Sequence, residues 1–184
     1  MGESARYTKV AIALHWAIAL LIIGNIAGGL YMVGLDFGDP VKFQIYQLHK
    51  SSGLTILVLS IVRIGWRLTH KIPPLPAAMP PWQKQGARLS HAAFYALMLL
   101  TPLLGWAYAS VAMFNVPTFW FGLFEWPHLP LGPPNAARAE RLAGLHEAAA
   151  FAIVGLLVLH IAAALKHHFV DKDGVAARML PFLK

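Results

Sequence analysis

LHEAAAFAIVGLLVLHIAAALKHH, residues 145–168, is the stretch around which the rest of the chain is arranged. It is apolar over a length that can cross a membrane as a helix, and it carries two histidines within the apolar part. His146 and His160 are fourteen residues apart, which is two heptads. Both imidazoles therefore point to nearly the same face, about 21 Å apart along the axis. Because ionisable side chains inside a span are costly, we interpret this pair as functional.

The composition of the 184-residue chain indicates an integral membrane protein. Hydrophobic residues make up 58% of the chain, charged residues only 12%, and the mean hydropathy is +0.57. These values are too apolar for a soluble domain of this size, and the length suits one bundle domain over residues 1–184. The absence of cysteine excludes disulfides, thiolate metal sites and a covalently attached c-type haem.

Four apolar runs predict an all-α, up-and-down bundle of membrane-spanning helices. We expect the spans at about residues 9–33, 43–68, 84–111 and 142–169. The first run is long, contains His15 and lacks a clear cleavage site, so we expect a retained span rather than a signal peptide. Residues 71–82 and 113–135 are too rich in proline for further spans. The aromatic residues of the second segment suit a lid in the interfacial layer.

Small residues and one proline shape two of these spans. Gly24, Gly28 and Gly29 narrow one flank of the first span, which suits the close approach of a helix or a flat cofactor. Pro102 and Gly105 interrupt the third span and predict a kink there, which neighbouring helices can accommodate.

The basic residues predict the orientation of the chain in the membrane. Four spans place both termini on one side. That side and the loop between the second and third spans hold eleven basic residues: Arg6, Lys9, Arg63, Arg67, Lys71, Lys84, Arg88, Lys166, Lys172, Arg178 and Lys184. The opposite face holds four: Lys42, Lys50, Arg138 and Arg141. Lys and Arg concentrate in cytoplasmic segments, so we expect both termini in the cytoplasm. Topology thus explains the net charge of +7, and no nucleic-acid partner is expected.

This topology gives each histidine a depth in the membrane. His15 and His160 fall at the cytoplasmic level, whereas His49 and His146 fall at the outer level. Zinc normally takes four ligands at one centre, which neither pair offers. Paired histidines in an apolar bundle suit a b-type haem, with one imidazole on each face of the ring. We therefore predict two stacked haems that form a path for electrons. The alternative for any single histidine is a hydrogen bond to a neighbouring helix.

Two basic residues are candidates for the surroundings of the haem propionates. Arg63 lies fourteen residues after His49 on the same face and could act as a counter-ion. Its alternative role is that of an arginine at a helix end whose charged head reaches the interface. Lys50 is the corresponding candidate beside the haem propionates at the outer level. His70 and His128 lie in loops, and we expect them to be solvated.

The chain resembles the bacterial cytochrome b561 family of small four-helix di-haem proteins. These are similar to the cytochrome b subunits of formate dehydrogenases and nickel-iron hydrogenases. The matching stretches are ALHW, QLHKSSGLTILVLSIVRIGWRL, RLSHAAFYALML, LAGLHEAAAF and VLHIAAALKHHFVDKDGVAARML. The resemblance implies one haem held by His15 and His160, and another held by His49 and His146. It also implies a place in the bacterial inner membrane, in contact with lipid, and electron exchange with ubiquinone or menaquinone.

Several residues are expected near the quinone at the cytoplasmic level. His91 could replace His15 as the partner of His160. It is shallower than His160, however, and we expect it to lie beside the haem or the quinone. His167 and His168 are candidates for proton delivery to the quinone, or for simple cations at a helix C-terminus. Lys166 and Asp171 belong to the same ALKHHFVDKD stretch and are placed on the quinone side with them.

Three functions remain open from the sequence. The first is a di-haem electron-transfer protein that links a quinone pool to an outer partner, such as a periplasmic redox protein. The second is a superoxide:quinone oxidoreductase acting alone, because some family members resemble superoxide oxidases. The four basic residues of the outer face could attract superoxide, or they are loop charges beside the propionates. The third is a haem-free bundle whose histidines relay protons or support transport.

Overall fold

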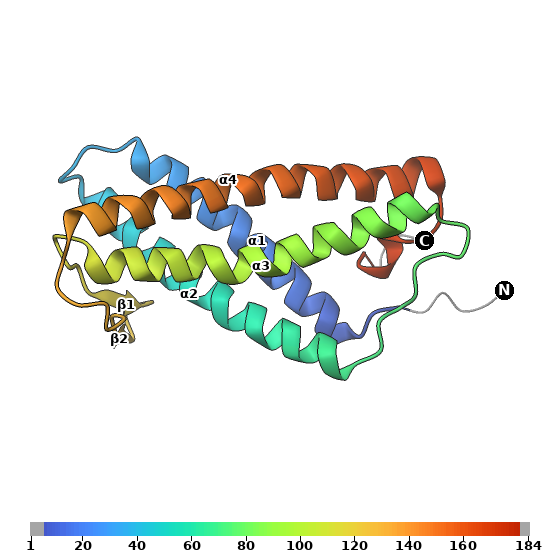
Figure 1. The fold of residues 1–184 in the computed structure, drawn as a ribbon, viewed down its shortest axis with the longest axis horizontal. Helices are drawn as coiled ribbons and strands as arrows, with labels where there is room; N and C mark the ends of the chain where they lie inside the picture. The colour runs from blue at the N-terminus through green and yellow to red at the C-terminus, as the bar shows by residue number, and fades with distance from the viewer. Residues whose placement is uncertain (1–5, 181–184) are drawn as a thin grey trace.

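The computed structural model describes residues 6–180, and Lys184 of the basic-residue count lies outside them. Four long helices run up and down along the bundle (Figure 1). Their bounds are α1 Lys9–Val33, α2 Pro40–Thr69, α3 Pro81–Val111 and α4 Ala136–Lys166. The prediction of an all-α, four-helix bundle is confirmed. We call the end that holds the start of α1 and the end of α4 the inner end, and the opposite end the outer end.

Helices α2, α3 and α4 begin before their predicted spans, whereas α1 begins at Lys9 as predicted. Asp39 caps α2 by accepting a hydrogen bond from the Val41 amide at 2.8 Å, and Pro40 occupies the first turn. Asn135 caps α4 by accepting from the Arg138 amide at 2.9 Å. Proline in the first turn loses no helical hydrogen bond, and Asp and Asn are favoured cap residues. The first turn of α2 contains Pro40 and Lys42 and that of α4 contains Arg138, so both helices begin ahead of their continuous apolar runs.

The chain folds back beneath the bundle after α4. It continues from α4 into a short π-helix, η1 His167–Asp171, and later forms a 3-10 turn, η2 Ala176–Arg178. The indole nitrogen of Trp16 on α1 donates to the Met179 carbonyl at 2.8 Å. Arg178 donates to the Pro74 carbonyl, in the loop between α2 and α3, at 2.6 Å. These two bonds hold the tail across the inner end.

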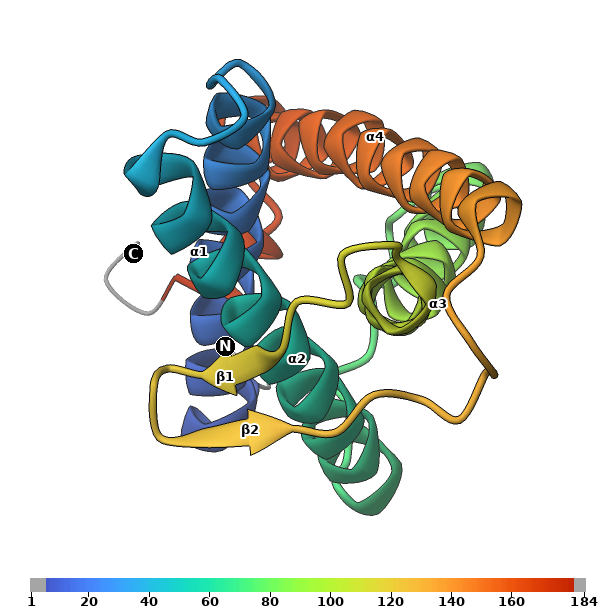
Figure 2. The ribbon, with the colours of Figure 1, turned by 90° about the vertical axis from the view of Figure 1, so that its left-hand side faces the viewer.

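The aromatic segment between α3 and α4 forms a two-stranded antiparallel hairpin, β1 Thr118–Trp120 and β2 Phe124–Trp126. The hairpin packs against α2 at the outer end (Figure 2). Ser51 of α2 donates to the Phe119 carbonyl at 3.0 Å and accepts from the Phe121 amide at 3.1 Å. The amide of Phe119 donates to the side chain of Gln47 at 3.3 Å. Gln47 and Ser51 of α2 thus supply hydrogen-bond partners for the backbone at the free edge of β1. A strand near lipid requires such partners, because no water is available there.

The helix surfaces are those of a protein that spans a membrane. All four helices are long and apolar enough to cross a bilayer, and only 6% to 22% of the most apolar window of each is buried within the protein. Large apolar side chains such as Leu20, Val158 and Leu159 are about two-thirds exposed, at 65%, 63% and 67%. Such surfaces are stable only against lipid tails. The chain is therefore a multi-pass membrane protein.

The buried core is small and lies midway along the bundle. Ile18, Ile22, Ile56, Met98 and Ile153 form one cluster to which all four helices contribute. Ile153 stands seven residues from each of the two histidines of α4. We call these five residues the central cluster. It separates an outer and an inner region of the bundle, and the histidines lie in those two regions.

Candidate functional site

The outer region brings together His49 of α2 and His146 of α4, as predicted. Their ring centres are 6.0 Å apart and their planes are inclined by 75°. The Nδ1 atom of His49 lies 3.1 Å from the Asn25 carbonyl oxygen of α1. The Nδ1 atom of His146 lies 2.8 Å from the Thr101 carbonyl oxygen of α3. A carbonyl only accepts, so both Nδ1 atoms carry the proton and both Nε2 lone pairs stay free for a metal.

Each of these imidazoles also lies against a glycine of the helix that provides its carbonyl acceptor. A Cβ placed on Gly29 would stand 3.1 Å from Cε1 of His49, and a Cβ on Gly105 would stand 3.0 Å from Cε1 of His146. Both glycines come one helical turn after the acceptor carbonyl. Helices α1 and α3 therefore position the two rings in the same way. Each provides a carbonyl that accepts from Nδ1 and a glycine that leaves room for the ring.

The spacing of the two rings fits a single metal ion between them. A bond from a metal to an imidazole nitrogen is about 2 Å long, and the ring centre lies roughly 1 Å beyond, so opposed imidazoles have centres roughly 6 Å apart. A cavity of about 440 Å³ opens between the two histidines and is lined by all four helices, mostly with apolar side chains. This volume is in the range of cofactor sites. The donor set, the cavity and the two glycines together fit a haem with two histidine ligands.

The inner region brings together three imidazoles rather than two. The ring centre of His160 lies 6.3 Å from that of His15 on α1 and 6.1 Å from that of His91 on α3. Phe94 packs edge-on against His160, with ring centres 5.3 Å apart. Both His15 and His91 therefore lie at a ring-centre distance from His160 that suits two ligands of one metal ion. The predicted pairing of His15 with His160 is therefore a proposal, and His91 is its alternative.

Arg63 lies inside the bundle beside this inner group. One guanidinium nitrogen donates to the Ala11 carbonyl at 2.9 Å, and the other lies 3.5 Å from Nδ1 of His15. The guanidinium only donates, so in this arrangement Nδ1 of His15 accepts. If His15 binds a metal through Nε2, its Nδ1 carries the proton and this contact is lost. The guanidinium is then free to turn to an anion such as a propionate.

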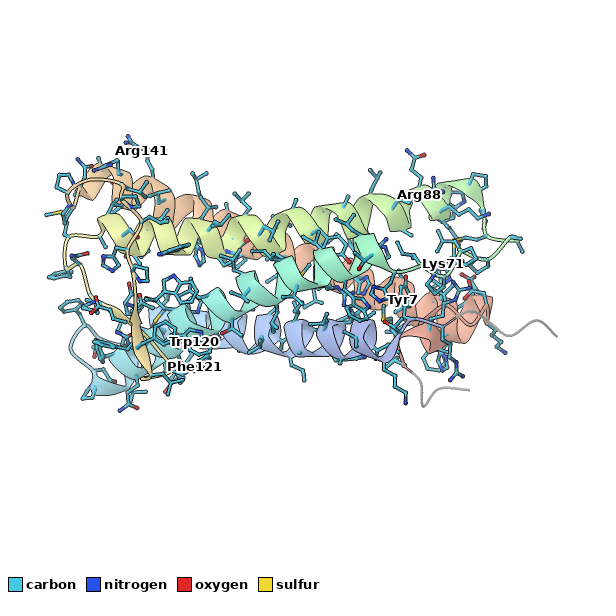
Figure 3. All side chains as sticks on the ribbon, turned by 90° about the horizontal axis from the view of Figure 1, so that it is seen from below. Tyr7, Lys71, Arg88, Trp120, Phe121 and Arg141 are labelled. Carbon is cyan, nitrogen blue, oxygen red and sulfur yellow. The ribbon has the colours of Figure 1, made fainter. Side chains whose placement is uncertain are left out.

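The four basic residues of the outer face are mostly engaged with loops. Lys50 donates to two carbonyls before β1, at 2.9 and 3.1 Å, and its ammonium lies 4.7 Å from the ring centre of Tyr46. Lys42 and Arg138 also donate to loop carbonyls. Arg141 makes no hydrogen bond within residues 6–180, and its side chain points away from the bundle (Figure 3). Lys50 also lines the outer cavity, so its predicted place near the outer cofactor is retained as a proposal.

The residues predicted on the quinone side form a hydrogen-bonded group at the end of α4. Lys166 pairs with Asp171. His167 is 2.7 Å from an oxygen of Asp173 and 3.3 Å from an oxygen of Asp171. His168 packs edge-on against the next residue along the chain. The sequence analysis missed Asp173, although it belongs to the same DKD run. In the described part of the chain, this group lines neither of the two cavities at the outer and inner ends.

The two loop histidines differ from each other. His70 is exposed and stacks on Trp66, with ring centres 3.8 Å apart. The prediction that His128 is solvated is wrong, because its side chain is half-buried and its Nε2 atom is enclosed without a hydrogen-bond partner in the described residues. The loop packs back on α3, where Trp106 donates to the carbonyl before His128 at 2.9 Å. A loop position therefore did not imply solvent exposure.

Comparisons with known proteins agree on one family. A family model described as prokaryotic cytochrome b561 matches residues 6–182. The chain is 34% identical to cytochrome b561 homolog 2 of Escherichia coli (strain K12), over 95% of this chain and 91% of the relative. It is 33% identical to cytochrome b562 of Cereibacter sphaeroides, over 98% of both chains. It is 31% identical to the probable superoxide oxidase CybB of Yersinia pestis, over 96% of both chains.

Proposed function

The chain belongs to the prokaryotic cytochrome b561 family of haem-binding membrane cytochromes that transfer electrons, and from this premise we propose that it is a di-haem cytochrome b. In this proposal it works in the bacterial inner membrane, with both termini in the cytoplasm. It passes electrons between ubiquinone or menaquinone in the membrane and a partner at the outer face. The quinone site lies at the inner end.

The observation that carries this proposal is the presence of two histidine groups at ligand spacing on either side of the central cluster. The outer ring centres are 6.0 Å apart, and those of His15 and His160 are 6.3 Å apart. Four helices contribute to the outer cavity, and α4 supplies a histidine to each level. Haem iron bound at these positions supplies one-electron redox chemistry.

The protein has three tasks in this function. His49 and His146 hold one haem, while His15 and His160 hold the other, and the carbonyls of Asn25 and Thr101 orient the outer pair. The central cluster excludes water between the two levels. Arg63 balances the propionate charge at the inner level, where a buried cation without a partner is costly.

Proton supply at the inner end is assigned to His167. Reduction of a quinone to a quinol consumes protons, which a histidine near the water surface can deliver. Asp173 accepts a hydrogen bond from Nδ1 of His167 at 2.7 Å, which fixes the orientation of the ring. Lys166 and Asp171 are held in the same group by their ion pair.

A reduced-minus-oxidised visible spectrum with a pyridine haemochrome count tests the proposal. We expect two low-spin b-type haems per chain in protein made with sufficient haem. One haem per chain means that one level holds something else. No haem overturns the proposal and leaves the haem-free proton-relay bundle as the function.

Superoxide oxidation is a second candidate, and two observations favour it. One relative is named a probable superoxide oxidase, and Arg141 points into solvent at the outer end. A positive charge there would raise the local concentration of an anion. Superoxide-dependent haem reduction that slows in Arg141→Gln, but not in Arg88→Gln at the inner end, supports this activity. Reduction only by a protein donor excludes it.

A further inference from the structure

A small pocket lies at the inner end, between the start of α1, the end of α2, α3 and the tail. Its volume is about 30 Å³, which is enough for a small group. Three basic residues line it: Arg63 and Arg67 of α2, and Lys71, which follows the end of that helix. Arg63 and Arg67 are one helical turn apart on the same face of α2, about 6 Å along its axis.

These three basic residues have no carboxylate partner among residues 6–180. No Asp or Glu of this part of the chain lines the pocket, and the ion pairs described there all belong to Lys166 or His167. The guanidinium of Arg67 is half-buried, and its described contact is with the ring of Tyr95, 5.6 Å away. Basic residues at the end of a spanning helix extend their charged heads to the interface, where anionic headgroups attract them. The pocket therefore suits an anion.

The other walls of the pocket place that anion at the boundary between water and lipid. Tyr7, Trp66 and Tyr95 line the pocket together with the apolar side chains of Ile72 and Met179. Tyrosine and tryptophan concentrate at the level of lipid headgroups. Figure 3 shows Tyr7 and Lys71 near each other at this end of the bundle, whereas Arg88 lies apart from them on α3.

We propose that Arg67 and Lys71 bind the phosphate of an anionic phospholipid in the leaflet at the inner end. Basic pockets between spanning helices recognise such headgroups. A haem propionate at the inner level would be held by Arg63, because a guanidinium nitrogen of Arg63 lies 3.5 Å from Nδ1 of His15. Arg67 lies one turn farther along α2 toward the inner end, and Lys71 follows the end of the helix, at the depth of the headgroups. This site does not depend on the proposed quinone chemistry.

Native mass spectrometry of the haem-loaded protein tests the site. The protein, purified in detergent, is titrated with phosphatidylglycerol and with phosphatidylcholine of the same acyl chains. We expect the wild type to retain phosphatidylglycerol preferentially. Arg67→Gln and Lys71→Gln are each expected to weaken this binding about fivefold, which corresponds to about 1 kcal/mol for one cation. Arg67→Lys keeps the charge and retains binding, and the matched control Arg88→Gln leaves it unchanged.

Three results would overturn the proposal. Equal retention of phosphatidylglycerol by the wild type and by both glutamine variants removes the site. Displacement of the lipid by inorganic phosphate at the same concentration makes the ligand a free anion. Loss of one haem from Arg67→Gln, with unchanged lipid retention, assigns the pocket to a propionate. The haem count of every variant is measured in parallel, so a failure of the lipid site is distinguished from a failure of the di-haem proposal.

Discussion

Each outer imidazole packs against a glycine, His49 against Gly29 and His146 against Gly105. In Gly105→Ala the new Cβ would stand 3.0 Å from Cε1 of His146, so the ring must move. We expect a changed electron paramagnetic resonance signal and midpoint potential for one haem of two. We also expect a loss of about 1–3 kcal/mol in the free energy of unfolding, as is usual for overpacking. Unchanged signals from both haems would contradict the described packing.

Gly155→Ala is the matched control for this prediction. Gly155 lies on α4, and a Cβ placed there meets nothing within 4 Å. Alanine has a better helix propensity than glycine by about 1 kcal/mol. The control is therefore expected to leave both haem signals unchanged and not to lower stability.

The ligands of the inner haem are tested by removing one imidazole at a time. His160→Ala is expected to remove the inner haem and to leave the outer one reducible, because the outer pair lies beyond the central cluster. His15→Ala should lose the same haem, whereas His91→Ala should keep two. The haem count and the visible spectrum of each variant measure this. Two haems in His15→Ala and one in His91→Ala would make His91 the ligand.

At the residue scale, the sequence predicts which histidines meet but not what orients them. The fourteen-residue spacing on one helix and the matching depths on two others were sufficient to pair His49 with His146. The acceptors of their Nδ1 protons are backbone carbonyls of Asn25 and Thr101, and no side-chain pattern encodes these. The position of His91 beside His160 also depends on how α3 packs against α4, which hydropathy does not specify.

At the scale of elements, the attachment of the hairpin to α2 depends on Ser51. This side chain is 1% exposed and makes two hydrogen bonds to the hairpin, one to Phe119 of β1 and one to Phe121 in its turn. Ser51→Ala leaves the part-buried amide of Phe121 without this acceptor and removes one of the two donors to the Phe119 carbonyl, at a cost of about 1–3 kcal/mol. We expect faster hydrogen exchange over residues 118–126, measured by mass spectrometry. Thr69→Ala, at the other end of α2, is the control, and the same exchange rates in both variants would refute the prediction.

The sequence predicted the helices better than their ends or the segment between α3 and α4. Hydropathy located all four helices because the apolar runs are long. It missed the first turns of α2 and α3, which contain prolines, and the apolar run of α4 begins six residues after the helix itself. The sequence did not predict the hairpin, because its strands are only three residues long and because its polar partners lie on α2, far away in sequence.

At the scale of the whole molecule, the orientation in the membrane is testable because the chain has no cysteine. Arg141→Cys and Arg88→Cys each introduce one exposed thiol, at the outer and the inner end (Figure 3). We expect a membrane-impermeant maleimide to label Arg141→Cys in intact spheroplasts. Arg88→Cys should react only after the membrane is opened. The opposite pattern would place the termini outside the cytoplasm.

The central cluster has a consequence for energy coupling. Its five members are apolar and buried, so it contains no group that could carry a proton between the two histidine levels. In the proposed di-haem function, an electron that passes through it would move charge without a compensating proton, and the step would be electrogenic. The membrane voltage acts directly on this step, by up to about 2.3 kcal/mol per 100 mV for a full crossing. An energised membrane would thus slow inward electron flow and favour the return of electrons toward the outer face.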